Sequence, residues 1–155
     1  MKYFNKILAA LAILMIICAG KTYASSTYEM NAEAVELLNQ LRESQGLQPL
    51  IWNPDSELQA AAELRAQEIS EVFSHTRPDG SSCFTVLQEY GLNYGYCGEN
   101  IAYGTNLSPE GAMDLWINSA GHYKNMVNRN FREVGLACYV EGANIYWVQL
   151  FFTHR

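Results

Sequence analysis

Apolar and polar positions in the middle of the chain follow a helical period. In the segment 31–45, apolar residues recur every three or four positions, and glutamate and glutamine side chains occupy the opposite face. Capping residues such as Asn53, followed by Pro54, mark further helix starts, and Gly46 and Gly91 mark ends. The pattern predicts four helices, at residues 31–45, 53–71, 81–90 and 108–119.

Toward the carboxy terminus the period changes to two. Apolar residues alternate with their neighbours over 134–140 and again over 146–152, as in two half-buried β-strands. Residues 141–144 are predicted to form the hairpin loop between them, and 101–103 to form a third short strand. Helices before and around a small, mainly antiparallel sheet indicate an α+β fold built in three layers.

The first 24 residues have a different character. Lys2 and Lys6 precede an uninterrupted apolar run at 7–20, and Thr22 and Ala24 are small residues at positions −3 and −1 of a cleavage site. This layout predicts a secretory signal peptide at residues 1–24 and one mature domain at 25–155; an uncleaved anchor is the alternative. The run of about 14 residues is shorter than the roughly 20 of a stable membrane-spanning helix, so no stable membrane insertion is expected after cleavage.

Removal of this leader makes the chain more acidic. The full sequence has 10 Lys and Arg against 16 Asp and Glu, with a formal net charge of −6. Three lysines lie before residue 25, so the mature domain keeps seven basic residues and has a net charge of −9. An acidic chain without a basic run argues against nucleic acid and anionic membranes as partners. We expect a secreted protein with an extracellular ligand that composition does not identify.

Three cysteines remain in the mature chain, Cys83, Cys97 and Cys138. Disulfides are permitted outside the cytoplasm, so one bridge and one free thiol are expected. Cys83 and Cys97 enclose a short, turn-rich loop, and we predict that this pair forms the disulfide. Cys138 is then a buried free thiol on a strand. A metal site built on cysteines is not indicated, because no Cys-x-x-Cys spacing occurs.

Two of the three histidines lie in distinctive surroundings. Residues 75–80 are His-Thr-Arg-Pro-Asp-Gly, residues 98–102 are Gly-Glu-Asn-Ile-Ala, and Gly-His follows Trp116 at 121–122. With Val-Gly at 134–135 and Trp-Val-Gln at 147–149, this order resembles the bacterial branch of the CAP superfamily. These are SCP-like extracellular proteins, akin to the cysteine-rich secretory, antigen 5 and pathogenesis-related-1 proteins. The resemblance covers about residues 31–152.

The resemblance implies an α-β-α sandwich with a central cleft in which two histidines and two glutamates meet. By position, His75 and His122 match the two histidines of the family, and Glu99 matches the first glutamate. The second glutamate lies three residues after the tryptophan, where this chain has Ser119. Three of the four groups are therefore present, and one negative charge is missing.

Two neutral imidazoles and a carboxylate are suitable ligands for a divalent cation such as Zn²⁺. We therefore favour a secreted binding module whose cleft, at His75, Glu99 and His122, takes a divalent metal or a small apolar ligand. A hydrolase of peptide, lipid or cell-envelope substrates, with His122 or Glu99 as general base, is one alternative. A structural or host-interaction protein is another. No His-Glu-x-x-His or Gly-x-Ser-x-Gly motif supports catalysis, so no enzymatic activity is assigned.

The signal peptide prediction can be tested by mass spectrometry. Cleavage between Ala24 and Ser25 should give a secreted protein whose intact mass corresponds to residues 25–155. A secreted form whose mass includes residues 1–24 would contradict both the cleavage site and the charge of the mature domain.

Overall fold

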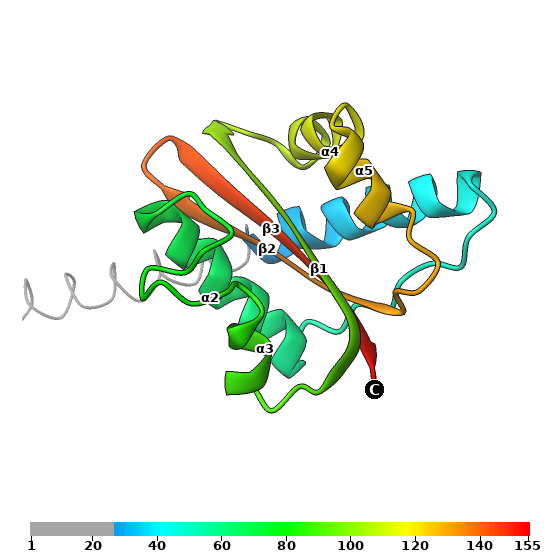
Figure 1. The fold of residues 1–155 in the computed structure, drawn as a ribbon. Coiled ribbons are helices and arrows are strands. Elements are labelled where there is room, and N and C mark those ends of the chain that lie inside the picture. Colours follow the sequence, from blue (N-terminus) through cyan, green and yellow to red (C-terminus); the bar gives the residue numbers. More distant parts are fainter. Residues whose placement is uncertain (1–26) are drawn as a thin grey trace, which may run out of the picture.

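A three-stranded antiparallel sheet forms the middle layer of the structure. The computed structural model describes residues 27–155, and the predicted signal peptide with its cleavage site lies outside these residues. The strands have the spatial order β1-β3-β2. Together with a helix at residues 27–44, the elements are α2 (Glu57–Glu71), α3 (Thr85–Glu89), β1 (Tyr94–Thr105), α4 (Pro109–Ile117), α5 (Ala120–Met126), β2 (Glu133–Glu141) and β3 (Asn144–His154) (Figure 1).

Helices cover both faces of this sheet. The helix at 27–44, α4 and α5 lie on one face, and α2 and α3 lie on the other (Figure 1). This arrangement confirms the predicted α+β class and the α-β-α sandwich. Within residues 27–155, none of the helices combines the length and the apolar character that a bilayer span requires.

The central strand β3 is buried on both faces. Trp147 and Phe151 pack in the core beneath the helix at 27–44 and α4, whereas Val148 and Leu150 pack in the core beneath α2. All four side chains are fully buried. Successive residues of a strand point to opposite faces, so a strand covered on both sides has a nearly continuous apolar sequence. β3 therefore belongs to both cores and joins the two helical layers.

The start of the second helix differs from the prediction. The sequence suggested Asn53 as the N-cap, but α2 begins at Glu57, and the hydroxyl of Ser56 accepts a hydrogen bond from the N–H of Gln59. Asn53 instead closes the preceding turn, where its side-chain oxygen accepts from the N–H of Asp55. Two good capping residues stand three positions apart, and local preference alone does not choose between them.

Helix α5, which carries His122, was not predicted at all. It has seven residues, of which only Met126 is buried, so it shows no apolar period. The other predicted elements are present. Gly46 and Gly91 follow the first helix and α3 with φ of +68° and +72°, and residues 141–144 connect β2 to β3.

Helix α2 packs directly on the sheet at Gly135. A Cβ atom on this residue would lie 2.4 Å from the carbonyl oxygen of Leu58 and 3.0 Å from Cβ of Ala62. Both contacts come from α2, and Ala62 is fully buried. The absence of a side chain at Gly135 therefore sets the distance between helix and sheet. It also places Arg65, less than a turn beyond Ala62, against the sheet.

We expect Gly135→Ala to destabilise the fold by about 2 kcal/mol, because the added methyl group overlaps backbone that cannot move independently. Urea denaturation followed by circular dichroism measures the change. Gly121→Ala is the matched control, since a Cβ atom there meets nothing within 4 Å, and its stability should be unchanged or slightly raised. Equal stability of wild type and Gly135→Ala would contradict the close packing.

Candidate functional site

Glu99 is a buried carboxylate on β1, and its residue is only 5 % exposed. Its Oε2 accepts a 2.8 Å hydrogen bond from Nε of Arg65, and its Oε1 lies 3.3 Å from Nη2 of the same guanidinium. Oε1 also lies 2.8 Å from Nδ1 of His75. Burial acts to raise the pKa of Glu99, but the hydrogen bonds from His75 and Arg65 outweigh it and hold the pKa below its usual value. Glu99 is therefore ionised at neutral pH.

Arg65 is the group that connects Glu99 to the rest of the site. It is fully buried on α2, and its Nη1 donates to Glu68 at 2.7 Å. Its Nη2 donates to the backbone carbonyl of Ser74 at 3.0 Å. One guanidinium thus holds β1, α2 and the residue before His75 in a fixed relation.

A second arginine holds the other end of the loop that carries His75. Arg77 donates to Glu68 on α2 at 2.6 Å and to Glu89 on α3 at 2.5 Å, and its Nη1 also donates to the hydroxyl of Thr85. Its residue is buried. The loop between α2 and α3 is therefore fixed before His75 by the hydrogen bond from Arg65 to Ser74, and after it by the ion pairs of Arg77.

His75 is the accessible member of this cluster, with 55 % of its side chain exposed. A carboxylate can only accept a hydrogen bond, so Nδ1 of His75 carries the proton that faces Glu99. The hydrogen bond to Glu99 raises the pKa of His75, although burial and the charge of Arg65 oppose this. In the neutral ring Nε2 is left as the basic nitrogen, and no other contact in residues 27–155 uses it.

His122 lies on α5, on the other side of the site, and is half-buried. Its backbone carbonyl accepts a 3.1 Å hydrogen bond from Nδ2 of Asn100, which is fully buried and also donates to Gln149. Burial lowers the pKa of His122, and the positive charge of His75 lowers it further. The two imidazoles therefore influence each other, but within the described residues no hydrogen bond joins the ring of His122 to His75 or Glu99.

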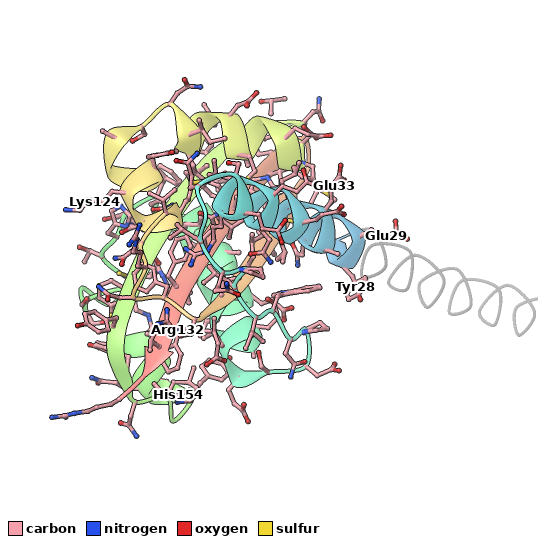
Figure 2. The ribbon with its side chains drawn as sticks, turned by 90° about the vertical axis from the view of Figure 1, so that its right-hand side faces the viewer. Tyr28, Glu29, Glu33, Lys124, Arg132 and His154 are labelled. Atoms are coloured by element: carbon pink, nitrogen blue, oxygen red, sulfur yellow. The ribbon has the colours of Figure 1, made fainter. Side chains whose placement is uncertain are left out.

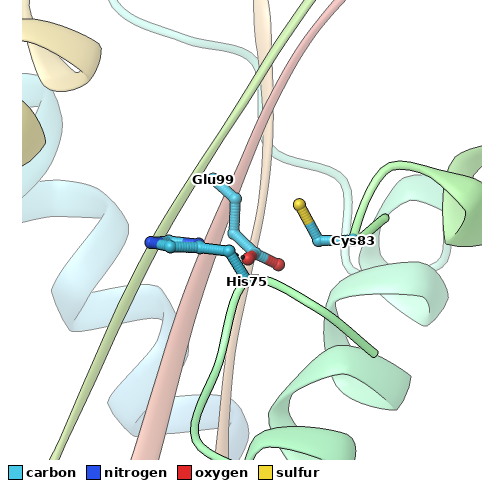
Figure 3. A group of neighbouring side chains, drawn as sticks. All are labelled: His75, Cys83 and Glu99. Carbon is cyan, nitrogen blue, oxygen red and sulfur yellow. Dashed lines mark hydrogen bonds and ion pairs between the residues drawn. The ribbon is translucent and has the colours of Figure 1, made fainter. Parts of the chain in front are cut away.

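Cys83 is a member of the cluster that the sequence did not indicate. One potential ligand atom each from Cys83, His75 and Glu99 lies within 4.8 Å of the other two. Figure 3 shows these side chains reaching toward one another from β1 and from two points of the loop between α2 and α3. Burial, followed by the charge of Glu99, raises the pKa of the Cys83 thiol to about 12, so it is protonated at neutral pH.

The predicted disulfide between Cys83 and Cys97 is not formed in the structure, where all three described cysteines are free. The two thiols have other neighbours: that of Cys83 interacts with Glu99 and that of Cys97 with the hydroxyl of Tyr94. Sequence spacing did not reveal that Cys83 is directed at a carboxylate. Cys138 is a buried free thiol on β2, as predicted.

Comparison with known families agrees with this architecture. The model of the cysteine-rich secretory protein family, CAP, matches residues 35–151. The chain belongs to the CAP family.

Three relatives illustrate the range of the similarity. The Bacillus subtilis protein YkwD is 38% identical over 129 residues, which cover 82% of this chain and 48% of YkwD. An extracellular protein with an SCP domain from Bacillus anthracis has a TM-score of 0.73 at 26% identity, covering 81% of this chain and 41% of that one. The fold is also shared with NaASP2, solved with Zn²⁺, at a TM-score of 0.58 and 17% identity, covering 79% and 78%. The chain thus spans less than half the length of YkwD and of the Bacillus anthracis protein.

The hydrogen bond between His75 and Glu99 makes a testable prediction. Glu99→Gln removes the charge that raises the pKa of His75 and leaves burial and Arg65, which both lower it. The pKa of His75 should therefore fall below its ordinary value of 6.5. Titration of the imidazole resonances by NMR measures this, with His154, which lies outside the cluster at the end of β3, as internal reference. An unchanged pKa of His75 would show that Glu99 does not control its protonation.

Proposed function

We propose that this protein is a secreted extracellular binding module that holds a divalent cation such as Zn²⁺ between His75 and His122. The observation that carries the proposal is the 2.8 Å hydrogen bond between Nδ1 of His75 and the buried carboxylate of Glu99. Histidines that bind metal through one ring nitrogen commonly donate the other N–H to a carboxylate, which fixes the tautomer and the orientation of the ring. Here that leaves Nε2 of an exposed imidazole as the donor atom.

In this proposal Glu99 orients a ligand and does not itself bind the cation. Both of its oxygens already accept hydrogen bonds, from the buried guanidinium of Arg65 and from His75. A cation at Glu99 would have to displace one of them. The sequence suggested Glu99 as a metal ligand, and its contacts favour the orienting role.

The second imidazole has the protonation state that a metal ligand needs. Because burial and His75 lower the pKa of His122, this ring is neutral at pH 7. Two imidazoles leave at least two positions of a tetrahedral zinc site for water or for the extracellular ligand. NaASP2, which has the same fold, was solved with Zn²⁺, and the related Bacillus anthracis protein is extracellular, which supports both parts of the proposal.

Calorimetric titration with ZnCl₂ tests the site. Wild type should bind one zinc ion at pH 7.5, and His75→Ala and His122→Ala should each abolish binding. Glu99→Gln should weaken binding by about 10- to 100-fold, as loss of an orienting carboxylate does in other zinc sites. Affinity should fall as the pH drops, and because the pKa of His75 is raised, the fall should begin above pH 6.5.

Two control variants test whether other side chains of the chain bind the zinc ion. His154→Ala removes the remaining histidine of the chain, at the carboxy-terminal end of β3, and should leave zinc binding unchanged. Cys83→Ser tests the neighbouring thiol and should also retain binding. Loss of binding in Cys83→Ser alone, or equal heats for wild type and His122→Ala, would refute the two-histidine site.

A further inference from the structure

Strand β2 forms one edge of the sheet, and other parts of the chain cover the start of that edge by forming hydrogen bonds with its outward backbone groups. The segment before α2 forms the first of these. The N–H of Ile51 donates to the carbonyl of Arg132 at 2.9 Å, and the carbonyl of Ile51 accepts from the N–H of Val134 at 3.0 Å. Unpaired backbone groups at a sheet edge attract other strands, and proteins commonly cover them.

Two buried side chains continue this cover. The side-chain amide of Gln59 accepts from the N–H of Leu136 at 3.1 Å and donates to its carbonyl at 3.0 Å, as a neighbouring strand would. The side-chain oxygen of Asn31 accepts from the N–H of Cys138 at 2.9 Å. Gln59 comes from α2 and Asn31 from the helix at 27–44, so the two helical layers meet over this edge.

The cover ends at Cys138. Successive residues of a strand present their backbone groups to alternate sides, so Val140 faces the same way as Leu136 and Cys138. Among the contacts of residues 27–155, no hydrogen bond involves the outward N–H or C=O of Val140, or the C=O of Cys138. One donor and two acceptors are therefore open in a row, which is the pattern that an added strand pairs with.

These open groups face a groove of about 690 Å³ between the helix at 27–44 and α2. Its floor includes residues 138–140, and its walls are rich in aromatic side chains. The rings of Tyr28 and Trp52 lie 5.7 Å apart on one side. Tyr28, half-exposed, projects from the outer end of the helix (Figure 2). The groove thus offers apolar faces for side chains beside a strand edge for a backbone.

The charge of the groove favours a basic partner. Among residues 27–155, Glu63 is the only charged side chain that lines it, and no lysine or arginine of this part of the chain does. Glu63 is exposed and accepts a 3.2 Å hydrogen bond from Nε2 of Gln59, the same amide that covers Leu136. The carboxylate therefore lies next to the covered part of the edge, in the groove that Cys138 and Val140 also line.

We propose that this groove binds an extended peptide, which adds as a fourth strand to β2 at Val140 and places a lysine or arginine side chain at Glu63. Backbone hydrogen bonds to Cys138 and Val140 supply register, and the aromatic walls take the peptide's alternate side chains. The site is on the β2 edge and does not depend on metal binding at His75 and His122.

The test uses the secreted form, residues 25–155, labelled with ¹⁵N, and the probe peptide acetyl-Thr-Val-Lys-Val-Thr-amide at up to millimolar concentration. In the free protein the amide of Val140 should exchange with solvent faster than those of Leu136 and Cys138. On binding, the Val140 signal should shift and its exchange should slow. The same peptide N-methylated at its internal amides keeps every side chain and should bind about tenfold more weakly.

Variants of the protein test the charge and the strand edge separately. Glu63→Gln keeps an oxygen that accepts the hydrogen bond from Gln59. It should lower the affinity for the lysine peptide about threefold at low salt. A peptide with glutamine in place of lysine should bind Glu63→Gln and wild type with equal affinity. Glu71→Gln, an exposed carboxylate near the end of α2, is the matched control and should change neither affinity. Val140→Pro removes the outward N–H of Val140. Within residues 27–155 the fold does not use this N–H, because it lies on the open edge of the sheet, but the added strand does, so binding should be abolished.

Four outcomes would overturn the proposal. The first two are an unshifted Val140 amide signal at millimolar peptide and equal affinities for the N-methylated and unmodified peptides. The third is binding of a chito-oligosaccharide at Trp52 where the peptide does not bind. The fourth is a dimer, detected by sedimentation, whose interface buries Val140. If Val140→Pro fails to fold, the Val140 exchange rate and the N-methylated peptide decide the question.

Discussion

The buried contact between Arg65 and Glu99 is the interaction on which the arrangement of the site depends. An ion pair removed from water costs free energy unless each charge meets further polar partners, and here both do. Glu99 also contacts His75, and Arg65 also binds Glu68 and Ser74. Loss of one partner of such a pair generally costs about 3–5 kcal/mol, because the other charge stays buried. Breaking the pair would therefore disturb sheet, helix and loop together, because Arg65 contacts all three.

A three-stranded sheet has two edges, and polar side chains satisfy much of both. On the outer side of β1, the indole N–H of Trp116 donates to the carbonyl of Ile101, and Nδ2 of Asn125 lies 3.3 Å from the carbonyl of Glu99. On β2, Gln59 and Asn31 have the same role. Buried backbone groups must find partners, so these amides and indoles are structural requirements of a small sheet. They also bring α4 and α5, and with α5 His122, to the site.

The imidazoles of His75 and His122 differ in basicity, and the charge of His75 acts on His122. Contact with a carboxylate raises the pKa of His75, and burial with a cationic neighbour lowers that of His122. Between the pKa of His122 and the higher pKa of His75, His75 is charged and His122 is neutral, so the two imidazoles are protonated in steps. A cation that needs both rings neutral competes with the proton at His75 first. The shared CAP fold supplies the backbone, and this asymmetry comes from the side chains around Glu99.

The sequence by itself determined the layers of the fold, because periods of 3.6 and 2 report which residues face a core, and β3 is apolar on both sides. It also indicated His75 and Glu99, through motifs whose order resembles the CAP family. Three features required the tertiary structure. Helix α5 buries only one residue, so its sequence shows no apolar period. Cys83 lies beside Glu99 and is not bonded to Cys97, the cysteine with which it encloses a loop. Arg65 falls at the spacing of the apolar positions of its helix, but only the close approach of α2 at Gly135 shows that its charge is buried against Glu99. Contacts between residues distant in the sequence, such as Arg65 and Glu99, depend on how the layers pack, and no local pattern records that distance.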